Sequence, residues 1–487
     1  MVLKHFYQVA ISLALLMVIL VIQPAATLAA PHPALRTAPR VDDFRIYFPT
    51  VGYQARNCRS LVSPNVFGIQ LYGNTGRSNN PYFLYYQNLG AAWVRAPIYW
   101  SSVEPTNTTP ANYNWSSADR VVGAAADACL NMIVTHIGAP DWAATAPDGP
   151  IDKVPLSELV EYITALVERY DGDGIDDAPR SPVVNYWEFY NEPDEAPNPN
   201  GGRWGHDGDK YAAMLAAVYP AVKAANPNAK VVFGGIAYDW FDTQSPPGPF
   251  VQRFLDDVLA AGGGAYFDIM NFHAYPSFAG TWTQNNGPGL REKAEAIRTK
   301  LQEYNLNKPV VITETGWHSD NDPIAHGSPE IQARYVLMLY TQSLAAQIDF
   351  SIWFSMIDPG SLYPFENGLI SDDNPPIVKP AYTAYQVAVG KLKNVTFQSK
   401  LSDAETGSHL VEVYRFTTVQ GKTLYIGWRN PVTSSDTQTV RLPAETVTVQ
   451  DLYGTVVATI QDNDDGQNDG QVTVTLSAAP VYIDVLN

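Results

Sequence analysis

Two stretches of the sequence end in a glutamate directly after an apolar, β-prone run. Val183–Pro193 reads VVNYWEFYNEP and closes on Asn191-Glu192-Pro193, while Val310–Trp317 reads VVITETGW and carries Glu314. Runs of β-branched and aromatic residues predict buried strands, so each glutamate is expected at a strand end. A protonated and an ionised carboxyl group on two sides of a glycosidic bond can protonate the leaving oxygen and attack the sugar carbon. The pair therefore indicates chemistry on glycosidic bonds.

These two strands belong to a longer alternation of strand-like and helix-like segments. The other candidate strands are residues 66–71, 93–100, 131–136, 231–236, 267–276 and 350–354, and candidate helices are 82–89, 116–130, 156–169, 290–304 and 380–391. Strands that alternate with helices predict an α/β fold with a parallel sheet, and eight such strands predict a (β/α)8 TIM barrel over residues 65–392. A barrel of this kind carries its chemistry at the C-terminal ends of its strands, where both glutamates are expected.

The two motifs together carry a family resemblance. Asn191-Glu192-Pro193 after an aromatic strand, followed by Thr313-Glu314-Thr315-Gly316-Trp317, resembles the clan of retaining glycoside hydrolases on (β/α)8 barrels. Within that clan the chain is most similar to the cellulase-like and β-xylosidase-like families with a C-terminal β-domain. The resemblance implies that Glu192 is the general acid and base and that Glu314 is the nucleophile. It also implies that Asn191 binds the sugar's 2-hydroxyl group and that a carbohydrate is the substrate.

The same resemblance assigns supporting roles to residues on three other strands. Arg95 would hydrogen-bond Glu314 and keep it ionised, although a salt bridge confined to the barrel interior is the alternative. Tyr275 would hydrogen-bond the nucleophile, and His273 shares its side of the strand because side chains alternate with period two. Trp353 would floor the subsite of the cleaved sugar, with core packing as the alternative.

Weaker site candidates follow from position alone. His136 and Trp142 lie at the end of the third strand, and Trp317 closes the second motif, so each is a candidate for substrate binding. Glu188 has the same parity as Glu192 and is expected inside the barrel in a supporting or binding role. We also expect the negative charge of Glu314 to raise the pKa of Glu192. Three further tryptophans, Trp204, Trp240 and Trp282, are expected either to stack on sugars or to pack within loops.

Composition narrows the class of partner. The 487 residues carry a net charge of −18, with 46% hydrophobic, 12% aromatic and 16% charged residues. This balance predicts a folded protein and argues against nucleic acid or an anionic membrane surface as a partner. No metal ion or organic cofactor is needed for two-carboxylate chemistry. Two acidic loops, Asp171–Asp177 and Asp462–Asp469, fit either a structural calcium site or a solvated turn, since neither has the full twelve-residue calcium pattern.

The N-terminal segment predicts export. A basic start, a short apolar core and a small-residue exit predict a signal peptide over residues 1–30, with an uncleaved membrane anchor as the alternative. Residues 31–64 are interpreted as a linker with one possible strand at Phe44–Phe48. The only two cysteines, Cys58 and Cys129, either form a disulfide or stay unpaired, and neither has the spacing of a nucleophile or a zinc ligand.

Residues 395–487 differ from the preceding part of the chain, because short β-prone runs alternate there with turns. They predict an antiparallel β-sandwich, either a structural accessory of the barrel or a carbohydrate-binding module. The sequence as a whole predicts a secreted retaining glycoside hydrolase that acts on β-linked polysaccharide or oligosaccharide. Two alternatives remain: a non-catalytic carbohydrate-binding protein on the same barrel, and a transglycosylase that uses the same residues.

Overall fold

The computed structural model describes residues 64–71, 83–196, 203–238, 249–276, 283–322, 325–360 and 365–486. The chain divides into two compact units, Met1–Ala55 and Arg56–Asn487, and every described residue belongs to the second. The predicted signal peptide, the possible strand at Phe44–Phe48, Cys58, Trp240 and Trp282 lie outside the described residues. Among the helices of the described part, none is long and apolar enough to cross a membrane.

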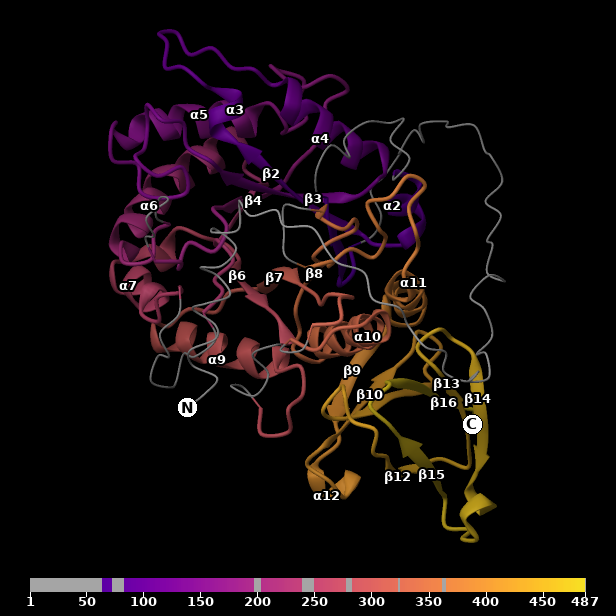
Figure 1. Cartoon of the computed structure of the whole chain (residues 1–487). Helices are drawn as coiled ribbons and strands as arrows, with labels where there is room; N and C mark the ends of the chain where they lie inside the picture. The colour runs from indigo at the N-terminus through magenta and orange to yellow at the C-terminus, as the bar shows by residue number, and fades with distance from the viewer. Residues whose placement is uncertain are drawn as a thin grey trace, which may run out of the picture. The chain divides into compact units, whose positions relative to one another are not determined.

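Eight parallel strands form the barrel, as Figure 1 shows. They are β1 (Phe67–Gln70), β2 (Trp93–Tyr99), β3 (Asn131–Ile137), β4 (Tyr186–Phe189), β5 (Lys230–Val232), β6 (Met270–Ala274), β7 (Val310–Thr315) and β8 (Ser351–Trp353). The hydrogen-bonded order runs β5-β4-β3-β2-β1-β8-β7-β6. Parallel bridges Val232–Ile269 and Ile236–Phe272 join β5 to β6 and nearly close the ring. The predicted (β/α)8 fold is confirmed.

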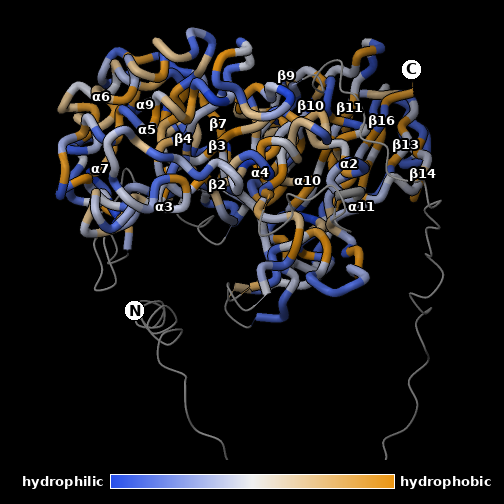
Figure 2. The backbone as a smooth tube through the Cα atoms, turned by 90° about the horizontal axis from the view of Figure 1, so that it is seen from above, coloured by the Kyte–Doolittle hydropathy of each residue, from blue (hydrophilic) through white to orange (hydrophobic). Residues whose placement is uncertain are grey.

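Helices follow the strands and cover the ring. They are α2 (Phe83–Leu89), α3 (Trp100–Val103), α4 (Ser116–Asp127), α5 (Leu156–Glu168), α6 (Gly208–Ala225), α7 (Phe254–Ala260), α9 (Leu290–Glu303), α10 (Pro329–Ala345) and α11 (Pro380–Leu392). Helix α5 buries Leu159, Ile163, Leu166 and Val167, which recur at helical spacing and so form one apolar face. Figure 2 shows the same recurrence of hydrophobic positions among hydrophilic ones along the chain.

Side-chain alternation separates two layers on each barrel strand. On β3, Thr135 points into the barrel and donates to Glu188 Oε2 at 2.6 Å. The next residue, His136, points the other way and packs on Tyr162 of α5, with ring centroids 5.6 Å apart. Because the strand period is two, adjacent residues belong to different layers of the fold. Only the inward layer can reach the carboxylates.

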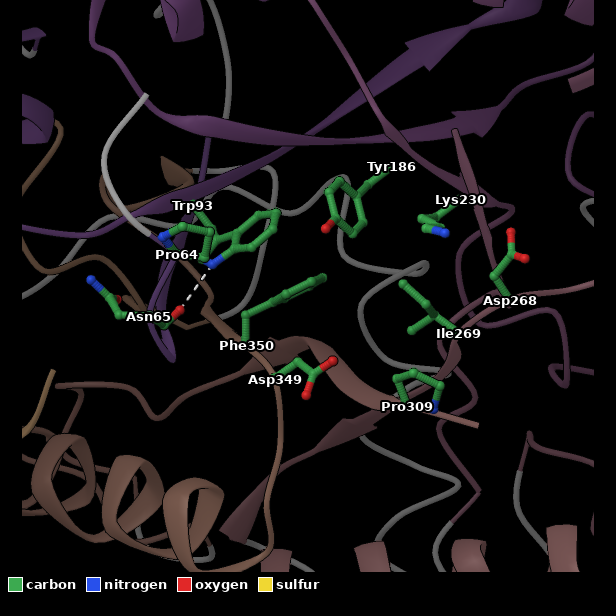
Figure 3. A pocket seen from close by; sticks show the side chains of 10 residues that line it. All are labelled: Pro64, Asn65, Trp93, Tyr186, Lys230, Asp268, Ile269, Pro309, Asp349 and Phe350. Carbon is green, nitrogen blue, oxygen red and sulfur yellow. Dashed lines mark hydrogen bonds between the residues drawn. The ribbon is translucent and has the colours of Figure 1, made fainter. Parts of the chain in front are cut away.

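The N-terminal ends of the strands are closed largely by aromatic side chains. Trp93 of β2 packs on Phe350 and Tyr186, with ring centroids 4.3 and 4.9 Å away. A cavity of about 490 Å³ lies against these rings (Figure 3). Cys129, between α4 and β3, is disulfide-bonded. Ring packing and a disulfide thus stabilise this end of the barrel. It lies opposite the end that carries the glutamates.

The C-terminal part is antiparallel, as predicted. A six-stranded sheet has the order β14-β13-β16-β11-β10-β9, and β12 pairs with β15 in a second sheet. The strands are β9 (Thr396–Lys400), β10 (Val411–Thr417), β11 (Thr423–Arg429), β12 (Gln438–Pro443), β13 (Thr446–Gln450), β14 (Val456–Gln461), β15 (Gln471–Leu476) and β16 (Val481–Val485). Their alternating inward residues form a separate apolar cluster that includes Val413, Val447 and Val474.

Buried polar contacts join this β-domain to the barrel helices. Glu412 of β10 is fully buried and accepts a hydrogen bond from Gln342 of α10 at 3.1 Å. Lys391 of α11 pairs with Asp484 of β16 at 3.0 Å. Because a buried carboxylate is costly unless its donors stay in place, the interface is built to remain closed. These contacts favour the structural-accessory interpretation of the domain.

Candidate active site

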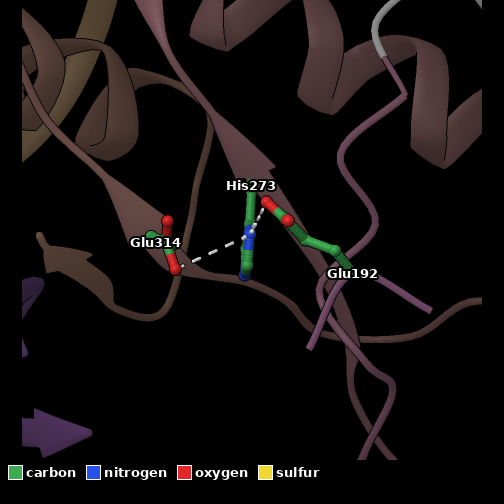
Figure 4. A group of neighbouring side chains, drawn as sticks. All are labelled: Glu192, His273 and Glu314. Atoms are coloured by element: carbon green, nitrogen blue, oxygen red, sulfur yellow. Dashed lines mark hydrogen bonds and ion pairs between the residues drawn. The ribbon is translucent and has the colours of Figure 1, made fainter. Parts of the chain in front are cut away.

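Two glutamates and a histidine meet at the C-terminal end of the barrel. Glu192 follows β4, Glu314 lies in β7, and His273 lies in β6, where it pairs in register with Glu314. One carboxylate oxygen of each glutamate and a ring nitrogen of His273 all lie within 4.8 Å of one another. Figure 4 shows the imidazole placed between the two carboxyl groups. The barrel thus brings together two side chains that are 122 positions apart in the sequence.

Glu314 has the two partners that the sequence predicted. The Tyr275 hydroxyl donates to its Oε1 at 2.6 Å, and Arg95 Nη1 donates to its Oε2 at 3.3 Å. The side chain is 14% exposed, so one side remains open. One donor on each oxygen fixes the orientation of the Glu314 carboxyl group.

Arg95 also anchors a second carboxylate. Its Nε and Nη2 donate to the two oxygens of Glu188 at 2.7 and 3.1 Å, and Nη2 donates to Asn191 Oδ1 at 2.7 Å. Burial alone would lower the pKa of Arg95, but the charges of Glu188 and Glu314 outweigh it and raise that pKa. The contacts of this arginine are therefore not confined to the interior salt bridge, because the same guanidinium also reaches Glu314.

Glu188 is a supporting residue with no free capacity. It is fully buried, and besides Arg95 it accepts from Thr135, Asn271, Thr313 and the backbone N–H of Gly235. Burial alone would raise the pKa of Glu188, but the charge and hydrogen bonds of Arg95 hold it below its ordinary value. Of the two roles predicted for this residue, support fits these contacts, because all six hydrogen bonds are internal.

Glu192 stands in a more cationic environment than we predicted. His273 Nδ1 lies 3.0 Å from its Oε1, and Arg203 Nη1 donates to its Oε2 at 3.2 Å. Burial alone would raise the pKa of Glu192, but the hydrogen bond and positive charge of His273, with the charges of Arg203 and Arg95, lower it to about 2. The net pKa of Glu192 is therefore lowered, not raised as the charge of Glu314 alone predicted, because His273, Arg203 and Arg95 outweigh one neighbouring carboxylate.

Arg203 is a site residue that the sequence did not single out. It donates through Nε to Glu195 at 2.8 Å and through Nη1 to the carbonyl oxygen of Asn191 at 2.9 Å, in addition to Glu192. It lies in the loop between β4 and α6, in a Gly-Gly-Arg-Trp run. The signal that could have identified it is an arginine next to two glycines in the loop that follows Asn191-Glu192-Pro193.

Backbone features fix the approach of these groups. Glu192 has a φ of 47° and Tyr190 a φ of 65°, a left-handed conformation that is uncommon for residues with side chains. Gly235 is required for a different reason, since a Cβ atom there would lie 2.2 Å from His273 Nε2. The ring of His273 therefore rests directly against the backbone after β5.

Five of the predicted or considered aromatic and histidine side chains have no described contact with the two glutamates. His136 is fully buried against the helices, and burial lowers its pKa to about 3. Each of three tryptophans donates its indole N–H to a backbone carbonyl: Trp142 to Glu104, Trp317 to His326 and Trp353 to Asn367. Trp353 and Trp204 are also buried, with relative exposures of 0% and 1%. For these two the packing interpretation fits, since neither ring face is open to a sugar.

A metal ion does not fit between the three central side chains. Glu192, His273 and Glu314 have the spacing of metal ligands, but Arg95 and Arg203 already place positive charge on both carboxylates. Both His273 nitrogens have partners, Glu192 and Thr313. A divalent cation would be repelled by the arginines and would have to displace these contacts.

The two acidic loops use their carboxylates in the same way, as acceptors of backbone N–H groups within the loop. Asp462 accepts backbone N–H bonds from Asp469, Gly470 and Gln471, and Asp469 itself pairs with Arg441. In the other loop, oxygens of Glu168, Asp171 and Asp173 lie within 4.8 Å of one another. In this loop too, Asp177 accepts from the N–H groups of Gly172 and Gly174, so internal donors bond carboxylates of both loops.

Comparison with solved structures shows the fold. The chain is similar to a family 39 glycoside hydrolase from the gut symbiont Bacteroides cellulosilyticus WH2, with 22% identity, a TM-score of 0.61, and coverage of 86% of this chain and 80% of that one. It is also similar to a glucosidase from Croceicoccus marinus (16% identity, TM-score 0.58, coverage 86% and 95%). A third is the catalytic domain of GH30 xylanase C from Talaromyces cellulolyticus (13%, 0.56, 88% and 98%). A search of curated proteins returns no match.

The family is shown by a sequence model rather than by these distant structures. A family model described as Cellulase (glycosyl hydrolase family 5) matches residues 54–355, which is more than half of the chain. The match spans all eight barrel strands and both glutamate motifs. The chain therefore belongs to the cellulase family, glycosyl hydrolase family 5, and is a glycoside hydrolase.

Proposed function

We propose that the protein is a retaining β-glycosidase in which Glu314 is the nucleophile and Glu192 is the general acid and base. The observation that carries the proposal is the spacing of the two carboxyl groups, whose oxygens approach within 4.8 Å. Retaining enzymes hold their carboxyl groups about 5–5.5 Å apart, whereas inverting enzymes leave about 6.5–9.5 Å for a water molecule. The close pair supports a double displacement through a covalent glycosyl intermediate.

In the first step Glu314 attacks the anomeric carbon while Glu192 protonates the departing oxygen. Arg95 and Tyr275 hydrogen-bond the two oxygens of Glu314, which fixes the orientation of the attacking carboxylate. The C–O bond to the aglycone breaks as the C–O bond to Glu314 forms, and the proton from Glu192 passes to the leaving alkoxide. The Asn191 side chain, whose Oδ1 accepts from Arg95, binds the sugar's 2-hydroxyl group in this proposal.

The proton for this step resides in the pair Glu192–His273. Thr313 Oγ1 donates its single proton to Glu188, so at its contact with His273 Nε2 it must accept. Nε2 therefore carries hydrogen, and the contact between His273 Nδ1 and Glu192 Oε1 requires one further proton between them. This shared proton lies within hydrogen-bond distance of Glu192 and is available to the carboxylate.

Substrate binding favours the protonated form of Glu192. Arg203 contacts Oε2 of Glu192, the oxygen that His273 leaves free. A glycosidic oxygen that approaches Oε2 displaces this arginine and removes one of the charges that lower the pKa of Glu192. In the second step the same cationic surroundings favour ionised Glu192, which takes a proton from the water that cleaves the glycosyl ester.

We further propose that the enzyme is exported and acts on a β-linked polysaccharide or oligosaccharide. Export rests on the basic, apolar and small-residue order of residues 1–30. The substrate class rests on family membership and on the similarity to a glucosidase and a xylanase. Transglycosylation uses the same residues and differs in whether water or a sugar accepts the glycosyl group.

The test is hydrolysis of β-linked glucan, xylan, mannan and galactan by the wild type, Glu192→Ala and Glu314→Ala, with and without azide. We expect activity on one polymer that falls by about 10²–10⁴-fold or more in both variants. Azide should give a glycosyl azide of retained configuration from Glu192→Ala and of inverted configuration from Glu314→Ala. Glu295→Gln, an exposed carboxylate on α9, is the control and should keep full activity.

Two results would overturn the proposal. Products of inverted configuration from the wild type would exclude double displacement. Full activity in either glutamate variant would remove that residue from its role. Product analysis of the same reactions separates hydrolysis from transglycosylation, because transfer yields oligosaccharides longer than the substrate.

A further inference from the structure

Asp194 lies two residues after Glu192 and is enclosed by backbone donors. Its side chain is 1% exposed. The N–H of Ala237 lies 3.1 and 3.0 Å from its two oxygens, and the N–H of Tyr238 donates to Oδ2 at 2.8 Å. Both donors come from the segment after β5. The carboxylate of Asp194 therefore ties the strand end that carries Glu192 to the neighbouring strand end.

The main chain around Asp194 makes a second attachment. Val251 N–H donates to the Asp194 carbonyl oxygen at 2.7 Å, and Ala196 N–H donates to the Pro249 carbonyl oxygen at 2.6 Å. Glu195 and Phe250 form an antiparallel bridge between these bonds. Residues 194–196 are therefore held on one side by 237–238 and on the other by 249–251.

A buried lysine connects the same peptide to His273. Lys293 of α9 is 1% exposed and donates to the carbonyl oxygens of Ala237 at 3.3 Å and His273 at 2.7 Å. Its charge also acts on Asp194. The contacts form a closed circuit from Glu192 through Asp194, Ala237 and Lys293 to His273, whose ring returns to Glu192.

Glu192 needs such a framework because its own backbone is unfavourable. A φ of 47° costs free energy for a residue with a side chain and persists only where the surroundings impose it. Burying the carboxylate of Asp194 beside Glu192 is also costly. Burial raises the pKa of Asp194 to about 7, and Glu192 acts in the same direction, against the Ala237 and Tyr238 N–H groups and Lys293.

We propose that Asp194 is a positioning residue for the general acid. Its bonds to Ala237 and Tyr238 hold the left-handed backbone of Glu192 so that the carboxyl group stays on His273 Nδ1 and faces the leaving oxygen. The proposal rests on the proposed role of Glu192 as general acid. A misplaced acid harms departure of a poor leaving group, which needs the proton, far more than departure of a good one.

The test compares leaving groups in Asp194→Asn, whose amide cannot accept from both N–H groups with two oxygens. Substrates are a 2,4-dinitrophenyl β-glycoside and an alkyl β-glycoside of the sugar that the wild type cleaves. For the alkyl substrate we expect kcat/KM to fall by about 10–100-fold. For the dinitrophenyl substrate we expect kcat/KM to fall by less than about 3-fold, since this leaving group needs no acid.

Two further variants keep the outcome decisive. Asp194→Ala removes the carboxylate without adding a donor and takes over the comparison if Asp194→Asn does not fold. Asp462→Asn is the matched control, because Asp462 is also a buried aspartate that accepts only backbone N–H bonds, here from three residues, but lies in the β-domain. It should lower stability and leave the ratio of the two kcat/KM values unchanged.

Glu192→Ala, measured in parallel, separates the two proposals. A selective loss in Glu192→Ala with an equal loss for both substrates in the Asp194 variants would overturn the positioning role alone. An equal loss for both substrates in Glu192→Ala would overturn the general-acid assignment, and the role of Asp194 with it. Selective losses in both residues support the circuit from Asp194 to Glu192.

Discussion

Two glutamates on one strand end, Glu188 and Glu192, have opposite surroundings. Glu188 is fully buried and accepts six hydrogen bonds from five residues. Glu192 is 19% exposed and has two side-chain partners, His273 and Arg203. Both have a pKa below the ordinary value, so ionisation does not distinguish them. What distinguishes them is unused hydrogen-bonding capacity, which a reacting group must keep for its substrate.

The largest effects are expected from the same substitution at these two positions. Glu192→Gln should lower kcat/KM for substrates with poor leaving groups by about 10²–10⁴-fold, with little change in stability. Glu188→Gln should destabilise the fold by about 3–5 kcal/mol, because Arg95 loses its buried counter-charge. Urea unfolding and steady-state kinetics on both variants measure the two effects.

Two results would contradict the assignment of catalysis to Glu192 and of stability to Glu188. A stable Glu188→Gln protein that has lost as much activity as Glu192→Gln would give Glu188 a direct part in the reaction. A Glu192→Gln variant destabilised by several kcal/mol would make that residue structural. Glu295→Gln on the surface of α9 serves as the baseline for both measurements.

A smaller effect is expected from Arg203→Gln, which removes one cation from Glu192. Since the charge of Arg203 lowers the pKa of Glu192, its loss raises that pKa. The Glu192–His273 pair should then keep its proton to higher pH. The alkaline limb of the kcat/KM profile is expected to move up by about 1 pH unit. Arg291→Gln on α9 is the matched control, and an unmoved limb in Arg203→Gln would exclude the electrostatic role.

The last prediction concerns stability and the buried His136. Burial lowers the pKa of His136 from 6.5 to about 3, so the unfolded chain binds a proton that the folded protein refuses. The free energy of unfolding therefore keeps its full value above pH 6.5, where His136 is neutral in both states, and decreases as the pH falls toward 3. His136→Phe should reduce the loss by about 1.4 kcal/mol per pH unit below pH 6.

Denaturant unfolding between pH 7 and pH 4.5 measures this slope. The exposed His409→Gln variant should keep the wild-type slope, since its imidazole is in water in both states. An unchanged slope in His136→Phe would show that His136 takes up its proton while the protein is folded.

The sequence sufficed for the barrel and for the central residues because both depend on local patterns. Apolar runs predicted all eight strands, and the two motifs placed Glu192 and Glu314 at the C-terminal ends of two of them. Period-two alternation paired His273 with Tyr275 on the inward side of β6, where both reach the glutamates. A buried arginine on β2 required a counter-charge, and Arg95 has one in Glu188.

The remaining errors come from information that is not local. The direction of His136 depends on where β3 begins to alternate, and one position decides between the barrel interior and the helices. Arg203 lies in a loop without a period, so its contact with Glu192 is set by the path of the chain after β4. The pKa of Glu192 was predicted from one neighbour, whereas three cations act on it.

The most direct test of the account is to trap the covalent intermediate. The enzyme is incubated with a 2-deoxy-2-fluoro-β-glycosyl fluoride of its own sugar, and its peptides are analysed by mass spectrometry. The account predicts one added glycosyl group on the peptide that contains Glu314, with loss of activity in step. Labelling of Glu192 instead, or lasting activity with no labelled peptide, would contradict the division of roles between the two carboxylates.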